Sequence, residues 1–145
     1  MSKKLFIIII LSSVWQSLFC QTSENNCPNN LIYFAYSLPV EDERWYLPIK
    51  YEIQGDLIDL KIRHKDKDEL FIRFKIIKKL MCNFKDIDNS NLKYEVLTYD
   101  EETNSYEKRI SEIEFKFSNG KGQIYIQHPN FPPIVSDATS IDEAQ

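Results

Sequence analysis

The sequence lacks the short motifs that mark common catalytic and nucleotide-binding sites. It contains no nucleophile elbow, no zinc-protease motif, no P-loop and no dinucleotide-binding fingerprint. Histidine is limited to His64 and His128, and nothing in the sequence brings these two side chains together as an acid–base pair. With no nucleophile–base set in the sequence, we expect a protein that is not an enzyme and that needs no cofactor.

Two segments have some of the side chains of a cation site, but neither has the full pattern. His64, Asp66 and Asp68 alternate with lysines, which would repel a bound cation. The segment from Asp86 begins like a calcium loop, yet its twelfth position is Leu97 instead of a bidentate glutamate. The sequence therefore predicts no metal site.

Excess positive charge is also absent. The formal charge of the chain is −4, whereas a nucleic-acid-binding domain normally carries a basic surface. We therefore expect no nucleic-acid partner. The one basic cluster comprises Arg73, Lys75, Lys78 and Lys79. Such a cluster could dock anionic glycans or lipid headgroups, but we favour the simpler interpretation of a solvated strand face.

No hydrophobic run in the sequence reaches the roughly 20 residues that a membrane-spanning helix needs. The apolar run 5–11 follows Lys3 and Lys4, and polar residues return from Ser12 onward, as in a secretory signal peptide. We predict a signal peptide at 1–20, a secreted product and no stable membrane insertion after cleavage. A lipoprotein interpretation, with Cys20 as the lipidated residue, is disfavoured by the bulky Phe19 before it.

Only three cysteines are present, and one of them lies in the predicted signal peptide. Cleavage after Cys20 would leave Cys27 and Cys82, an even number that suits an oxidising compartment. Neither has a histidine beside it and no Cys-x-x-Cys pair exists, so a reactive or metal-binding thiol lacks support. We therefore predict a disulfide between Cys27 and Cys82.

Glycine is scarce, with three residues, while aromatic residues make up 13% of the chain and isoleucine is frequent, a composition typical of strands. Short apolar runs alternate with turn signals from Leu31 to about His128. We expect a single-domain, all-β fold at 21–130, an antiparallel β-sandwich of about seven or eight strands. The proline-containing and acidic residues 131–145 are expected to form a flexible tail.

One segment, 70–83, fits two secondary structures. Leu70, Phe74, Ile77 and Met81 follow the spacing of an amphipathic helix. The same segment also alternates apolar and polar residues, and its isoleucine and aromatic content favours a strand. We therefore predict a strand.

The candidate binding residues lie in two connections that each join an acidic centre to an aromatic residue. They are Glu41, Asp42 and Trp45 in the loop 39–46, and Tyr99 beside the loop 100–105. Aromatic side chains on loops commonly anchor recognition, so we expect a non-enzymatic module that binds an extracellular protein or glycan. The competing interpretation is that the acidic residues only keep two hairpin tips soluble.

An alternative function is a carrier of a small hydrophobic ligand, held between the two expected sheets. The high isoleucine and phenylalanine content would supply an apolar lining for such a site. A cavity would favour the carrier, whereas a filled core with a surface aromatic patch would favour the binding module.

Overall fold

The computed structural model describes residues 27–40, 43–63 and 68–141, and these residues form an all-β fold without a helix. No helix in these ranges is long and apolar enough to cross a membrane. The strands are β1 (Asn30–Ala35), β2 (Leu38–Val40), β3 (Glu43–Trp45), β4 (Ile49–Gln54), β5 (Leu57–Arg63), β6 (Asp68–Asp86), β7 (Asn89–Asp100), β8 (Ser105–Ser118), β9 (Lys121–Gln127) and β10 (Ile134–Thr139).

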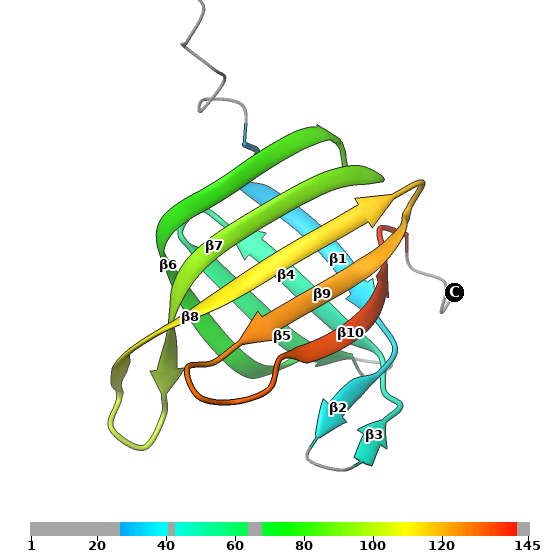
Figure 1. Ribbon diagram of the computed structural model, residues 1–145. Helices are drawn as coiled ribbons and strands as arrows, with labels where there is room; N and C mark the ends of the chain where they lie inside the picture. Colours follow the sequence, from blue (N-terminus) through cyan, green and yellow to red (C-terminus); the bar gives the residue numbers. More distant parts are fainter. Residues whose placement is uncertain (1–26, 41–42, 64–67, 142–145) are drawn as a thin grey trace, which may run out of the picture.

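Eight of these strands form a closed antiparallel barrel (Figure 1), in the order β1-β10-β9-β8-β7-β6-β5-β4. From β4 to β10, each strand pairs with the next one in the sequence. β1 completes the ring between β10 and β4. β2 and β3 form a separate small hairpin beside one end of the barrel.

The predicted antiparallel all-β class is confirmed, but the predicted β-sandwich is wrong, because the sheet is continuous. β6 is 19 residues long and joins what would otherwise be two sheets. Its residues 68–75 pair with β5, and its residues 74–86 pair with β7. A long, bulged strand of this kind curves, and a continuous curved sheet closes into a barrel when its first and last strands meet.

The strand that allows closure is β10, in a region predicted to belong to a flexible tail. β10 pairs with β9 over its whole length and with the end of β1. Its buried side chains are small, with Ser136 and Ala138 facing the core. The assignment of 131–145 to a flexible tail is therefore wrong for Ile134–Thr139.

The segment 70–83 lies within β6, so the strand prediction is confirmed there. Three register shifts interrupt its pairing with β7, between Ile76 and Lys78, between Lys79 and Met81, and between Phe84 and Asp86. Each shift breaks the strict two-residue alternation of a strand. These bulges account for the helix-like spacing of apolar residues in the sequence.

The two ends of the barrel are built differently. At the upper end in Figure 1, which we call the closed end, backbone hydrogen bonds join neighbouring turns. The Gly55 amide donates to the Asn29 carbonyl (2.7 Å), and the Gly120 amide donates to the Asp88 carbonyl (3.0 Å). The opposite end, which we call the mouth, lies beside the β2–β3 hairpin, the β7–β8 connection and the β9–β10 loop.

The sulfur atoms of Cys27 and Cys82 lie at disulfide-bonding distance, and their Cα atoms are 5.8 Å apart. This is the pair that the sequence predicts, and a disulfide is compatible with an extracellular protein. Beyond Lys75, β6 no longer pairs with β5. The disulfide ties this part of β6 to the segment before β1, and the Lys79 ammonium adds a hydrogen bond of 3.2 Å to the Asn29 side chain. The bridge therefore closes the sheet where ladder pairing is missing.

We predict that replacing both Cys27 and Cys82 by serine lowers the free energy of unfolding by about 4 kcal/mol, because the bridge spans a separation of 55 residues. Urea unfolding of the oxidised protein and of the double variant measures this difference. Thiol titration of the unfolded, unreduced chain 21–145 should find no free thiol. Two free thiols, or equal stability of both proteins, would contradict the bridge.

Candidate functional site

Strand β8 shows how the barrel interior changes from one end to the other. Every second residue of this strand faces inward, as strand geometry requires. From the closed end, the inward series begins with Phe117, Phe115, Ile113 and Ser111, all of which are buried. It continues towards the mouth with Arg109 and Glu107, which line a cavity. A single strand therefore contributes both to the packed core and to a potential binding site.

Aromatic rings fill the interior near the closed end. Phe115 packs against three buried tyrosines, with ring centroids 5.2 Å from Tyr33, 6.1 Å from Tyr51 and 6.3 Å from Tyr94. The Tyr33 and Ser90 hydroxyl groups are hydrogen-bonded at 2.9 Å. Eight-stranded barrels are just wide enough to be filled by side chains or to hold one small ligand. In this barrel, the aromatic cluster takes up the half that faces away from the mouth.

We predict that alkaline pH destabilises this interior. Burial raises the pKa values of Tyr51 and Tyr94 to about 12, above the ordinary value of 10.0. The unfolded chain therefore loses these protons at lower pH than the native state does. Stability should be constant up to about pH 9 and should fall between about pH 10 and about pH 12, with each unit of pKa difference corresponding to about 1.4 kcal/mol per group.

Denaturant midpoints measured from about pH 8 to about pH 11.5 test this expectation. The Tyr51→Phe variant is the matched control, because it keeps the ring and removes the titrating hydroxyl. It should lose less stability than the unmodified chain over the same range. Parallel pH profiles of the two proteins would contradict the role of Tyr51.

The mouth contains a cavity of about 750 Å³, which we call the mouth cavity. This volume lies within the range of roughly 300–1,000 Å³ that is typical of small-molecule sites. Its lining residues are Leu38, Pro39, Trp45, Leu60, Phe71, Ile72, Phe74, Thr98, Glu107, Arg109, Ile126, His128, Pro129, Phe131, Pro132, Pro133 and Ile134.

Most of this lining is apolar, and it comes from three parts of the fold: the β2–β3 hairpin, strands β5 and β6, and the segment from the end of β9 to the start of β10. Leu60, Phe74 and Ile126 are buried and form the floor of the cavity. Trp45, Phe71 and Phe131 remain 46%, 44% and 61% exposed. Large exposed aromatic side chains around a cavity are unusual unless another molecule covers them. The arrangement suits an apolar ligand that enters between these rings.

Four lining residues are polar, and they come from β7, β8 and the position that follows β9: Thr98, Glu107, Arg109 and His128. The His128 Nδ1 atom lies 2.8 Å from the Ser111 hydroxyl, which fixes the orientation of the imidazole ring. The Thr98 hydroxyl is buried and has no hydrogen-bond partner among the described residues. A mostly apolar cavity with a few polar groups is the usual composition of a site for a small amphiphilic or hydrophobic molecule.

The structure brings only part of the predicted binding site to this cavity. Trp45 lines it, but Tyr99 does not. The Tyr99 ring packs edge-on against Tyr106, with centroids 5.3 Å apart, and its hydroxyl donates to the Asn104 side chain. Glu41 and Asp42 lie outside the described residues. Binding through these two acidic connections therefore stays a prediction.

The sequence interpretation missed the part of the cavity that follows β9. One wall is formed by Pro129, Phe131, Pro132 and Pro133, although the sequence predicts a flexible tail from residue 131 onward. The available signal was the apolar residue between prolines, because proline stiffens a loop that presents a side chain. Phe71 was missed for another reason: a register irregularity in the β5–β6 ladder, between Leu60 and Lys61, changes the alternation on which the assignment of faces depended.

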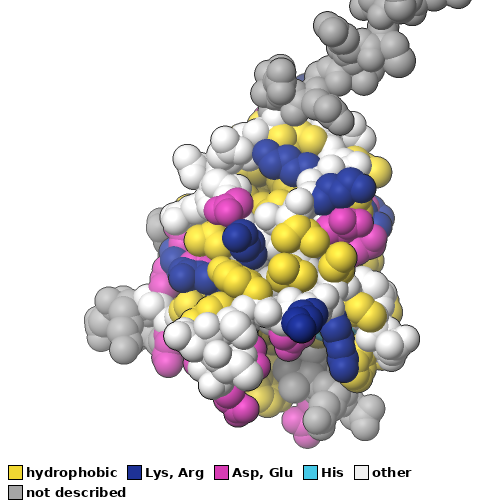
Figure 2. All heavy atoms as spheres, turned by 90° about the vertical axis from the view of Figure 1, so that its left-hand side faces the viewer, with side chains coloured by type: hydrophobic (Ala, Val, Ile, Leu, Met, Phe, Trp, Pro, Cys, Tyr) yellow, Lys and Arg dark blue, Asp and Glu magenta, His cyan; other side chains and the backbone are white. Residues whose placement is uncertain are grey.

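The predicted basic cluster lies on the outer surface of β6. Figure 2 shows this face, on which hydrophobic side chains lie among Lys and Arg side chains. Ile77, Leu80 and Met81 of β6 are exposed. The Lys75 ammonium lies 5.8 Å from the centroid of the Tyr106 ring, so part of the basic cluster is used within the protein.

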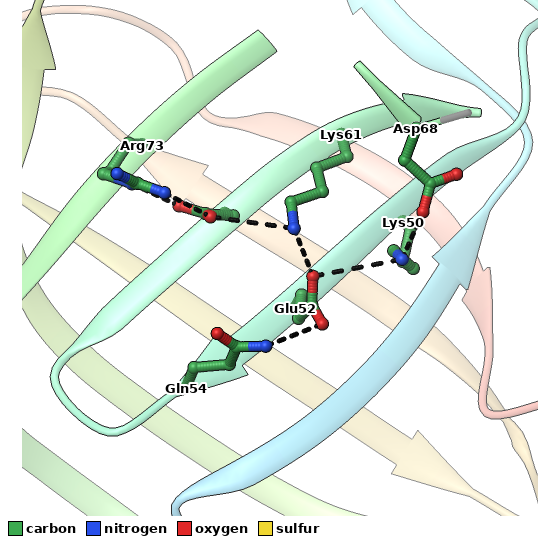
Figure 3. Close-up of polar contacts among 7 residues, drawn as sticks. Lys50, Glu52, Gln54, Lys61, Asp68 and Arg73 are labelled. Atoms are coloured by element: carbon green, nitrogen blue, oxygen red, sulfur yellow. Dashed lines mark hydrogen bonds and ion pairs between the residues drawn. The ribbon is translucent and has the colours of Figure 1, made fainter. Parts of the chain in front are cut away.

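Arg73 has a structural partner in an ionic network on the outside of β4, β5 and β6 (Figure 3). Its Nε and Nη2 atoms donate to the two carboxylate oxygens of Asp59, at 2.7 and 2.8 Å. These hydrogen bonds raise the pKa of the Arg73 guanidinium. The Lys61 ammonium pairs with Glu52 at 2.5 Å. The paired charges favour a role in holding adjacent strands together over a role in ligand binding.

Metal-ligating side chains do not converge in the part of the chain that the structure describes. No group of three His, Cys, Asp or Glu side chains there could hold a metal ion. His64 and Asp66, which the sequence places near one another, lie outside this part.

Comparison with known proteins gave no assignment. No protein-family model, curated protein or solved structure matches the chain.

Proposed function

We propose that this chain is a secreted, non-enzymatic carrier that holds a small hydrophobic ligand in the mouth cavity. The observation that supports this function is an apolar cavity of about 750 Å³ at the mouth of a barrel whose other half is packed. Secretion is supported by the signal-peptide pattern at 1–20 and by a disulfide, which forms in oxidising compartments.

A ligand in the mouth cavity fits the structure better than a ligand held between two sheets. The closed end is occupied by aromatic rings, so the ligand would enter only the half of the barrel beside the mouth. The exposed rings of Trp45, Phe71 and Phe131 would be covered by such a ligand. Covering apolar surface of this kind contributes roughly 25 cal/mol per Å² before the cost of immobilising the ligand.

Trp45 provides an internal reporter for this proposal. The chain contains two tryptophans, and Trp15 lies in the predicted signal peptide, so Trp45 is the one in chain 21–145. We predict that methyl laurate, a neutral apolar probe, binds saturably at one site and shifts the Trp45 emission to shorter wavelength. The shift is expected because the ligand replaces water around a ring that is 46% exposed.

The Phe71→Ala variant should bind methyl laurate about five-fold more weakly, because it removes apolar lining from the cavity. Ile110→Ala is the matched control: Ile110 is 47% exposed on β8, close to the 44% of Phe71, but does not line the cavity. This control should bind as the unmodified chain does. Equal weakening in both variants, or no saturable shift in the unmodified chain, would contradict the proposed site.

A second candidate function is recognition of an extracellular protein or glycan by an exposed aromatic residue next to the β2–β3 hairpin. The observation that favours it is Tyr46, which is 82% exposed immediately after Trp45. If the chain had this function alone, Tyr46→Ala would reduce partner capture, and the unmodified chain would not bind methyl laurate saturably. The carrier function requires no such partner, so probe binding separates the two candidates.

A further inference from the structure

Three of the polar residues that line the mouth cavity lie at an irregularity in the pairing of β7 with β8. Leu97 pairs with Ile110 and Tyr99 pairs with Tyr106, so three residues of β8 lie opposite the single residue Thr98. Bulges of this kind redirect side chains and are frequent next to functional sites. Here the bulge brings Glu107 and Arg109 beside Thr98, and all three residues line the cavity.

Arg109 is a cationic group of this cavity that has no counter-ion among the residues that the structure describes. Within the described part of the chain, its guanidinium forms neither an ion pair nor a side-chain hydrogen bond. Glu107 also lines the cavity, but no ion pair joins it to Arg109. The N–H groups of the guanidinium are therefore available to donate hydrogen bonds to a ligand. Their planar arrangement matches that of a carboxylate.

The Thr98 hydroxyl gives a second, independent indication of a polar ligand group. It is buried without a hydrogen-bond partner among the described residues, although a buried hydroxyl group is normally paired. Within the described residues, the Thr98 hydroxyl and the Arg109 guanidinium therefore both lack a partner at the same bulge. Such a pair of groups suits a ligand atom that accepts hydrogen bonds. The rest of the cavity lining is mostly apolar and includes Phe71 and Phe131, so it suits an apolar chain.

We infer that the ligand is a carboxylate-headed amphiphile, with its head group at the β7–β8 bulge and its apolar chain in the mouth cavity. Arg109 forms the ion pair with the carboxylate, and Thr98 provides a neighbouring hydroxyl. Glu107 opposes the head group electrostatically and limits the affinity. This inference rests on the proposed carrier function and adds the chemical class of the ligand.

The test compares laurate, methyl laurate and dodecylamine at about pH 8, where laurate is ionised and the amine is charged. The three probes share one alkyl chain and differ in the head group. Binding is followed through Trp45 emission. We expect laurate to bind about five-fold more tightly than methyl laurate, which is the affinity equivalent of one partly exposed ion pair.

Three variants assign the preference to residues. Arg109→Gln should equalise the affinities for laurate and methyl laurate by weakening laurate alone. Lys108→Gln removes the same charge from an adjacent exposed residue that does not line the cavity, and it should preserve the preference. Glu107→Gln should strengthen laurate binding about two-fold. Thermal melts of the variants check that each one folds.

The outcomes separate the two proposals. If methyl laurate binds and laurate binds no more tightly, the head-group inference is overturned while the carrier function stands. Tighter binding of dodecylamine, or a preference for laurate that survives Arg109→Gln, also overturns the inference. If none of the three probes binds, the carrier function itself fails. The comparison of probes on the unmodified chain requires no variant, so it decides the inference even if Arg109→Gln does not fold.

Discussion

The architecture depends on one short seam, the pairing of β1 with β10. Only two residue pairs join these strands, Phe34 with Thr139 and Ala35 with Ala138, whereas β1 makes six pairs with β4. Without this seam the sheet would have two exposed edges, which are prone to pair with other chains. With it, the inward faces of all eight strands enclose one core. The small buried side chains of β10, Ser136 and Ala138, allow the curved sheet to meet at this point.

The seam also explains which parts of the fold could be predicted from the sequence. Residues such as Ile49, Tyr51 and Ile53 alternate strictly, and each of them is buried as the alternation predicts. Closure, by contrast, depends on strand length and curvature, which are properties of the whole sheet. The pattern of β10 is obscured because it follows Pro132 and Pro133 and has few large apolar residues. The sandwich prediction is wrong for this reason, although the antiparallel all-β class is correct.

The candidate site was less predictable because it lies where the regular pattern breaks. Trp45 is an aromatic residue in a loop with an acidic centre, and a sequence shows this directly. Phe71 lines the cavity beside a register irregularity of β6, and Arg109 does so at a bulge of β8. A bulge depends on which residues of two strands face each other, and this information lies in the pairing and not in either strand alone. The sequence of β8 alone therefore does not distinguish Arg109 from any other charged residue on a strand.

The chain enters and leaves the described barrel at the same end. The described fold starts at Cys27, which the disulfide fixes at the closed end. After β10 it leaves at the same end, since the Ser140 amide donates to the Gly120 carbonyl in the β8–β9 turn. Both attachment points are thus remote from the mouth. If the barrel were attached to a surface or to another domain through either of these points, its mouth would face away from the attachment. Small molecules could then still enter and leave the mouth cavity.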